Sequence, residues 1–286
     1  MPHRFIAAAR PSCYHVSMTT TTATEVIDTA RVDKLAFYLQ KAVNKANRRY
    51  HLLADGDIVL VAVSGGKDSM SLLDLLWRRQ ATSPDHYTLL AVHIRADAHC
   101  GRGVSVEWLS AWCAAHGIPF MVKDLAVAAE RDAARQAGEQ ACFRCAWLRR
   151  KALFDTAAQV GCTKLAFAHH ADDIAETTLM NLFYTATFRP MDAKMPFFGG
   201  RFTLIRPLCY VEERDIITFA EASGYPLEGE RCPEAATSRR TLVRGVLREL
   251  DKNCHGVRRR VCAAAEHAQE KVSRARGEHL PDDLAS

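Results

Sequence analysis

IVLVAVSGGKDS, from Ile58 to Ser69, is the stretch of this 286-residue chain that decides its fold. Its first half is a continuous apolar, β-branched run, as expected for a strand buried on both faces of a parallel sheet. Its second half is a glycine-containing turn that leads into a helical pattern beginning at Met70. Such a strand-to-helix turn binds anions, because glycines let the backbone approach closely and the helix dipole favours negative charge. The stretch therefore predicts a phosphate-binding loop in an α/β protein.

The loop does not have the spacing of the Walker motif, and its pattern SGGxDS resembles that of the PP-loop ATP pyrophosphatases, which cleave ATP between the α- and β-phosphates. The alternative is a glycine-rich turn without a ligand. Lys67 can neutralise phosphate charge, and a carboxylate such as Asp68 is a usual Mg²⁺ ligand beside ATP phosphates. We expect six residues to bind ATP: Ser64, Gly65, Gly66, Lys67, Asp68 and Ser69.

Predicted strands and helices alternate along most of the chain. Apolar runs predict further strands at 87–94, 118–122 and 164–168. Apolar residues at helical spacing predict helices at 32–50, 70–79, 104–116, 142–160, 172–184, 211–223 and 237–250, and proline and glycine residues make 188–206 a loop or hairpin. This alternation predicts a doubly wound parallel sheet with helices on both faces.

A second polar cluster follows the strand predicted at 164–168. His170, Asp172 and Asp173 stand where the strand ends, and the carboxyl ends of parallel strands line the ligand crevice. We expect the two carboxylates to position Mg²⁺ or water and His170 to orient the base or a phosphate. The alternative is that one aspartate caps the helix that follows. With Lys67 and Asp68, these three residues form the predicted catalytic set.

Ten cysteines without a secretory signal favour a reducing compartment and metal-binding or reactive thiols. Cys142 and Cys145 form a CxxC pair at the start of a predicted helix, and Cys232 stands in a predicted loop. Three interpretations remain open: a structural zinc site, a redox pair, and an iron–sulfur cluster held by three thiolates with one iron open.

The charge of the chain is unevenly distributed. Residues 237–260 carry eight basic and two acidic side chains, so that this segment has a charge of +6 and the rest of the chain has −1. Such a segment indicates a polyanionic partner or a solvated basic helix. No stretch approaches the roughly 20 apolar residues of a membrane-spanning helix, and we expect no membrane partner.

Four motifs in one order resemble the tRNA 2-thiocytidine synthetase family of PP-loop ATP pyrophosphatases. They are SGGKDS at Ser64, CFRC-x-x-LRR at Cys142, AHHADDIAETTLMNLFY from Ala168 and RPLCYVEERDI from Arg206. The resemblance implies an adenine nucleotide alpha hydrolase-like fold, a cytoplasmic enzyme that uses ATP and Mg²⁺, and replacement of the C2 oxygen of cytidine 32 in tRNA by sulfur. It also implies a [4Fe–4S] cluster on Cys142, Cys145 and Cys232 and a cysteine desulfurase as sulfur donor, and it leaves a homodimer open.

On this interpretation we divide the chain into a disordered tail (1–30), an N-terminal helix (31–55), a PP-loop domain (56–210), a C-terminal helical tRNA-binding part (211–262) and a loose tail (263–286). The residues predicted to bind tRNA phosphates are Arg149, Arg150, Arg239, Arg240 and Arg244. The competing functions are a cluster-free PP-loop ligase of the lysidine synthetase kind and a non-catalytic, zinc-containing tRNA-binding protein.

Overall fold

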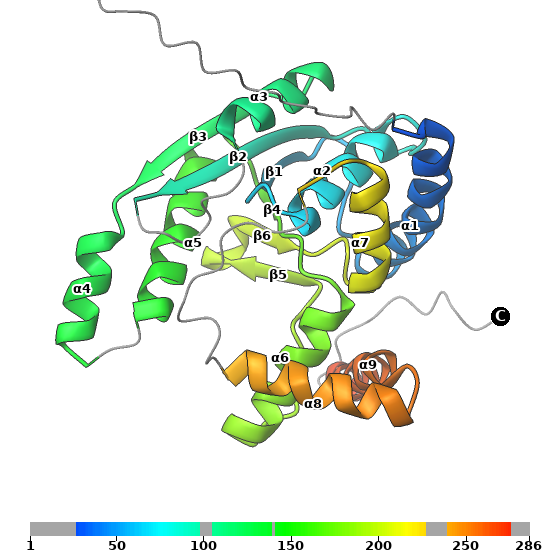
Figure 1. Ribbon diagram of the computed structural model, residues 1–286, viewed down its shortest axis with the longest axis vertical. Helices are drawn as coiled ribbons and strands as arrows, with labels where there is room; N and C mark the ends of the chain where they lie inside the picture. The colour runs from blue at the N-terminus through cyan, green and yellow to red at the C-terminus, as the bar shows by residue number, and fades with distance from the viewer. Residues whose placement is uncertain (1–26, 98–104, 139–140, 227–238, 276–286) are drawn as a thin grey trace, which may run out of the picture.

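A computed structural model describes residues 27–97, 105–138, 141–226 and 239–275. At its centre is a six-stranded sheet in the order β3-β2-β1-β4-β6-β5, in which only β5 runs antiparallel to its neighbour (Figure 1). The strands are β1 (Ile58–Ala62), β2 (Thr88–Ala96), β3 (Phe120–Leu125), β4 (Lys164–Ala166), β5 (Lys194–Phe197) and β6 (Phe202–Ile205).

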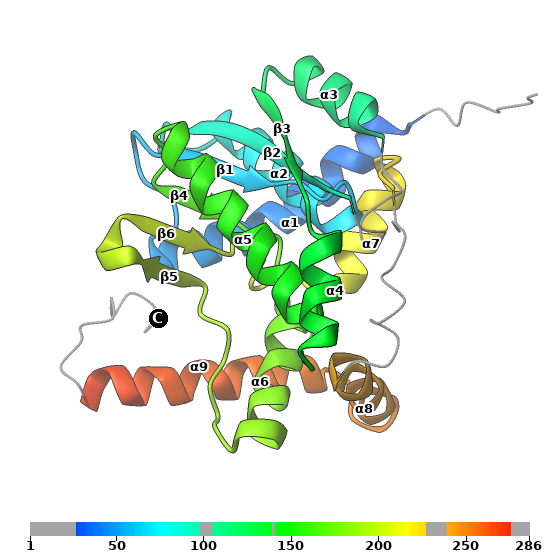
Figure 2. The same ribbon diagram turned by 90° about the vertical axis from the view of Figure 1, so that its left-hand side faces the viewer.

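Helices cover both faces of the sheet. Alternate residues of β1 point to opposite faces and pack in two different cores. Val59 and Val61 pack in a core with α1 (Thr29–Tyr50), α2 (Lys67–Gln80), α3 (Val106–Ala115) and α7 (Glu213–Ala222). Leu60 points the other way and packs in a second core with Leu153 and Phe154 of α5 (Ala141–Gln159). Figure 2 shows α5 crossing the front of the sheet, with α1 and α2 behind it. The doubly wound α/β fold is therefore confirmed.

The parallel strands begin on one side of the molecule and end on the other. We call the edge where the parallel strands end the carboxyl edge, and the edge where they begin the amino edge. Helix α6 (Ala171–Thr185) follows β4 at the carboxyl edge, and its Ala175 packs with Val243 of α8 (Arg239–Asn253) and Val257 of α9 (Val257–Ala275). These three helices form a layer beyond that edge, at the bottom of Figures 1 and 2.

Several predicted boundaries are corrected by the structure. The segment 188–206 contains a hairpin of β5 and β6 joined by a short 3-10 turn (Phe198–Gly200). Helix α4 (Ala128–Gln136) is an element that the sequence interpretation missed. The first part of the segment from residue 263 is helical, because α9 continues to Ala275 and buries Ala265.

The N-terminal helix begins at Thr29, so its first two residues fall in the tail predicted to be disordered (1–30); residues 1–26 lie outside the described part of the chain. Within the described ranges, no helix combines the length and the apolar character that a membrane crossing requires.

Candidate active site

The phosphate loop connects β1 to α2 at the carboxyl edge, as its sequence predicts. Gly65 has a φ of +88°, a left-handed conformation that a side chain would strain. The Ser69 hydroxyl accepts the backbone N–H groups of Ser64 at 3.1 Å and Gly65 at 3.2 Å, and it donates to the Gly66 carbonyl at 3.0 Å. Ser69 therefore shapes the loop from within, and its predicted direct contact with ATP stays a prediction. Ser64 is exposed at the mouth of the loop.

Lys67 is the first residue of α2 and is held between two carboxylates. Its Nζ donates to Asp68 Oδ1 at 2.7 Å and to Glu213 Oε1, on α7, at 3.0 Å. Burial alone would lower the pKa of Lys67, but these two carboxylates outweigh it and raise that pKa. The pKa of Glu213 is lowered, because the Lys67 charge outweighs the effect of burial. Lys67 is therefore a fixed positive charge at the helix start that phosphates would approach.

Glu213 is the functional candidate that sequence reasoning missed. It belongs to the RPLCYVEERDI segment, which was quoted for its resemblance without a role for this residue. Its contact with Lys67 joins positions 146 residues apart, and no local spacing reveals such a contact.

His170 stands at the start of α6 and brings the second cluster to the phosphate loop. Its ring is buried, and its Nε2 lies 3.8 Å from Asp68 Oδ1 and 3.4 Å from Asp173 Oδ2. Its Nδ1 lies 3.7 Å from Asp172 Oδ2 and makes no hydrogen bond within the described part of the chain.

The two aspartates of the cluster both support helix starts. Asp173 accepts the His170 backbone N–H at 3.2 Å and so caps α6, while Asp172 accepts the Glu213 backbone N–H at 2.7 Å and so fixes the start of α7. Burial alone would raise the pKa of Asp173, but the combined effects of His170, His169 and Arg240 outweigh burial and lower it. The capping interpretation is thus confirmed for Asp173, and a catalytic role for either residue stays a prediction.

Arginines of α8 and α9 neutralise the acidic side of the site. Arg244 makes two hydrogen bonds to the buried Glu176, the shorter at 2.6 Å, and Arg240 lies 3.1 Å from Asp173 Oδ1. Arg258 of α9 pairs with Asp172 at 2.9 Å. Arg240 and Arg244 were predicted to bind tRNA phosphates, and the structure gives both of them carboxylate partners within the protein. Arg239, by contrast, is exposed and lies over the ring of Tyr184.

A cavity of about 440 Å³ opens beside Asp172 between α7, α8 and α9. Its wall is rich in arginine and includes Arg214, Arg244, Arg248, Arg258 and Arg259. The wall also contains four carboxylates: Arg258 pairs with Asp251, and Arg214 and Arg259 pair with Glu212, so most of its positive charge is matched within the protein.

The CxxC pair lies at the same edge of the sheet. Helix α5 leads into β4, so it runs antiparallel to the strands and starts at the carboxyl edge. Cys145 is buried against Ala96 and Leu125, the last residues of β2 and β3, whereas Cys142 is exposed one turn earlier. Arg144, which lies between the two cysteines in sequence, pairs with Glu130 of α4 at 2.7 Å. Cys232 lies outside the described residues.

The other predicted tRNA-binding residues follow the cysteines on α5: Arg149 is half-buried and Arg150 is exposed. No group of three His, Cys, Asp or Glu side chains with metal-binding geometry occurs within the ranges that the structure covers.

Comparison with known proteins links the whole arrangement to a group of ATP-using enzymes. A sequence profile for the PP-loop domain matches residues 35–250. A tRNA-cytidine(32) 2-sulfurtransferase of Geobacter sulfurreducens is 36% identical over 250 residues, which cover 86% of this chain and 94% of that protein. A protein of the same name from Neisseria meningitidis is 34% identical over 225 residues, covering 78% of this chain and 70% of the relative.

A solved structure shares the fold. The U34-tRNA thiolase NcsA from Methanococcus maripaludis, determined with its [4Fe–4S] cluster, superimposes with a TM-score of 0.65 at 21% identity and covers 84% of this chain and 80% of its own.

Proposed function

This chain belongs to the tRNA-cytidine(32) 2-sulfurtransferase family of PP-loop proteins, and from that premise we propose that it uses ATP to replace the C2 oxygen of cytidine 32 in tRNA with sulfur. The observation that carries the proposal is the meeting of the phosphate loop with the His170 cluster, where Asp68 Oδ1 and His170 Nε2 are 3.8 Å apart. An ATP phosphate at the loop and a base at the cluster would then be neighbours.

The first chemical step is adenylation of the base. ATP binds with its phosphates at the start of α2, and the C2 oxygen of the cytidine attacks the α-phosphorus while the bond to the bridging oxygen of pyrophosphate breaks. Lys67 stabilises the charge that develops on the departing pyrophosphate, and it does so without reorganising, because Asp68 and Glu213 already hold its ammonium group. Asp68 is the proposed protein ligand of Mg²⁺, with ATP phosphates and water as the other ligands.

In the second step a sulfur nucleophile attacks C2, and AMP leaves with the original oxygen. His170 is proposed to orient the base, since its ring lies beside the phosphate loop, with Nε2 3.8 Å from Asp68 Oδ1. The target base must be unpaired or extruded to reach the site. The cavity beside Asp172 is the proposed binding site for the adjoining RNA phosphates.

We further propose that Cys142, Cys145 and Cys232 hold a [4Fe–4S] cluster. Two of these thiols lie at the carboxyl edge at the start of α5. Cys232 lies outside the described residues, seven residues before Arg239, the first residue of α8. These thiols fit the group: a cluster held by three protein thiolates supplies an iron with an open coordination position for sulfur. A cysteine desulfurase, acting with the enzyme in the cytoplasm, is the proposed source of sulfur.

The decisive test is a thiolation assay with the anaerobically purified protein, ATP, Mg²⁺, sulfide and unmodified tRNA. Mass spectrometry of the digested tRNA should detect 2-thiocytidine, and AMP and pyrophosphate should appear in equal amounts. The matched control is the same tRNA with uridine in place of cytidine 32. ATP cleavage without any thiolated nucleoside would contradict the proposal and would favour a PP-loop ligase.

A further inference from the structure

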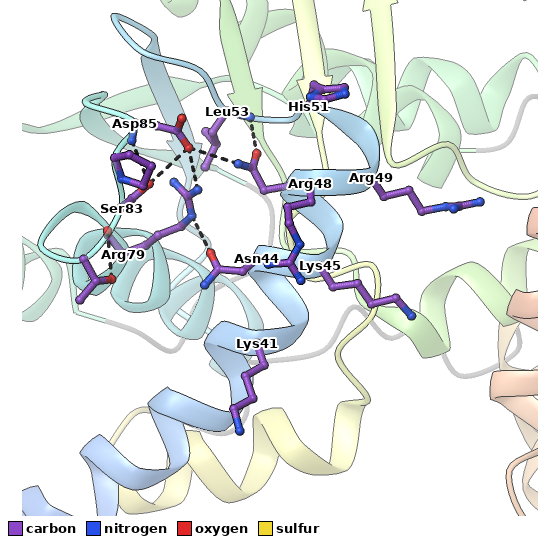
Figure 3. A pocket seen from close by; sticks show the side chains of 13 residues that line it. Lys41, Asn44, Lys45, Arg48, Arg49, His51, Leu53, Arg79, Ser83 and Asp85 are labelled. Atoms are coloured by element: carbon purple, nitrogen blue, oxygen red, sulfur yellow. Dashed lines mark hydrogen bonds and ion pairs between the residues drawn. The ribbon is translucent and has the colours of Figure 1, made fainter. Parts of the chain in front are cut away.

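A second cavity, of about 800 Å³, opens at the amino edge of the sheet, away from the phosphate loop (Figure 3). It lies between the C-terminal half of α1 and the turn after α2, next to where β1 and β2 begin. Its basic lining consists of Lys41, Lys45, Arg48, Arg49, Arg79 and His51. The phosphate loop follows the opposite end of β1, so this cavity belongs to a different part of the molecule from the active site.

The positive charge of this cavity is largely unmatched. Its lining contains one carboxylate, Asp85, which is already engaged by Arg79 at 2.7 Å and by the Asn47 amide at 3.3 Å. Arg49 pairs with Glu270 of α9. No ion-pair partner occurs, among the residues that the structure describes, for three of its side chains: Lys41, Lys45 and Arg48.

Arg79 provides a rigid donor in the wall. It is only 4% exposed, and its guanidinium is fixed between Asn44 Oδ1 at 2.9 Å and Asp85. Its Nη1 is buried and makes no hydrogen bond within the described part of the chain. A buried donor without an acceptor costs about 1–3 kcal/mol, so an anion that reaches Nη1 gains that interaction. Figure 3 shows this guanidinium between Asp85 and Asn44 of α1.

Complementing the helix dipole explains only part of this charge. Arg48 and Arg49 lie in the last turn of α1, where cations are favoured. Lys45 and Lys41 precede the last residue, Tyr50, by five and nine residues, and the dipole effect fades beyond the last turn. The lysines therefore require another explanation.

We propose that this face of α1 and its cavity bind backbone phosphates of the substrate tRNA at a distance from the modified nucleotide. The spacing of Lys41, Lys45 and Arg48 places them on one helix face over roughly 10 Å, which suits a row of phosphates better than a single small anion. The exposed rings of Phe37 and Tyr38 precede them, with the Lys41 ammonium 4.6 Å from the Phe37 ring centre. Basic residues beside exposed aromatic rings are the pattern of an RNA-binding surface.

The test compares tRNA binding by the wild type and by the double variant Lys41→Gln/Arg48→Gln over a range of salt concentrations. Each phosphate contact adds about 0.7–0.9 to the slope of log affinity against log salt. We expect the double variant to bind about tenfold more weakly at 100 mM salt and to lose about 1–2 from that slope. The loss should be equal for substrate and non-substrate tRNAs, because phosphate contacts carry no sequence information.

The matched control is Lys123→Gln/Arg135→Gln, which removes two exposed charges from β3 and α4. This control should retain the wild-type slope. Equal losses in both double variants would overturn the proposal, and so would an unchanged affinity and slope in Lys41→Gln/Arg48→Gln. Calorimetry with inorganic pyrophosphate adds a further arm: binding that disappears in this variant while tRNA binding persists would indicate a small-anion site instead.

The inference rests on the proposed function, but the two fail separately. Binding is measured without ATP. A wild type that thiolates no tRNA would therefore refute the proposed function, whereas the salt dependence of tRNA binding would still test the proposed surface. Far-UV circular dichroism confirms folding of both double variants, whose substituted residues are all exposed.

Discussion

The two edges of the sheet differ in whether their charged side chains have partners of opposite charge. At the carboxyl edge nearly every charged side chain has a partner of opposite sign: Lys67 with Asp68 and Glu213, Asp172 with Arg258, and Glu176 with Arg244. At the amino edge Lys41, Lys45 and Arg48 project toward solvent without an ion-pair partner in the described ranges. The first arrangement holds side chains in fixed positions, and the second leaves charge available to a polyanion.

This difference separates two kinds of work. Chemistry gains from charges that are fixed before the substrate arrives, because nothing must then reorganise in the transition state. Association with a polyanion gains from exposed cations, whose effect depends strongly on salt. Changes at the carboxyl edge should therefore alter rate or stability, and changes at the amino edge should alter affinity.

The largest effect is expected for Lys67→Met. Loss of a fixed charge on the departing pyrophosphate should lower kcat/KM for ATP-dependent thiolation by about 10²–10³-fold. The affinity for tRNA, measured by anisotropy, should change less than about twofold, because the ammonium group is enclosed by its two carboxylates. The control is Lys123→Met, an exposed lysine on β3. A normal rate of pyrophosphate release in Lys67→Met would contradict the assignment of the chemical step to the fixed charges of the carboxyl edge.

The next effect concerns thiols at opposite edges. Cys142→Ala should lower the rate of thiolation by more than about 100-fold and reduce the iron content of the protein, while ATP binding persists. The change is at an exposed site, so folding should not suffer. Cys162→Ala is the control, because this buried thiol stands just before β4 at the amino edge. Equal thiolation rates in the two variants, or zinc in place of iron in the wild type, would show that the CxxC pair has no part in sulfur transfer.

The carboxyl edge was more predictable from the sequence than the amino edge because its parts are local. The strand, the glycine turn and Lys67 are contiguous, and His170, Asp172 and Asp173 directly follow a strand, so that the topology of a parallel sheet brings the two groups together. The fold followed from the same alternation of strands and helices.

What the sequence did not reveal depends on contacts between distant segments. Glu213 reaches Lys67 across 146 residues. The amino-edge cavity requires Lys41 and Arg48 from α1 to face Arg79 from the end of α2, and the sequence alone indicates only a basic end to a helix. Helix α4 was missed because it buries just two side chains, Arg131 and Ala134, and so lacks an apolar stripe.

A smaller effect tests whether the matched charges stabilise one another. Glu176 is almost fully buried and Arg244 is about one third exposed, so Arg244→Met should lower the free energy of unfolding by about 2 kcal/mol. Replacing both residues by Met should recover part of that loss, because no uncompensated buried charge remains. The control pair is Arg95 and Asp124, both more than half exposed, where truncation should leave the free energy of unfolding nearly unchanged. Urea titration of the variants in both pairs measures these changes in the free energy of unfolding. Equal changes in the two pairs would contradict the prediction.

The last effect is absent at neutral pH and concerns His169, which lies beside this network without adding charge to it. Burial, and next the charge of Arg206, lower the pKa of His169 to about 4, whereas the unfolded chain has a value near 6.5. Between these values the unfolded chain binds a proton that the folded protein does not. The free energy of unfolding should therefore fall as the pH drops from about 6.5 toward 4, by up to about 1.4 kcal/mol per pH unit.

His169→Gln should remove this component of the pH dependence, since glutamine does not titrate and its carbonyl can accept the hydrogen bond that Arg206 donates to His169 Nδ1 at 3.2 Å. Urea titrations of the variant and the wild type between pH 4 and 8 measure it. A slope that is the same in both proteins would mean that His169 carries charge in the folded state, and the carboxyl edge would then hold an excess cation, as the amino edge does.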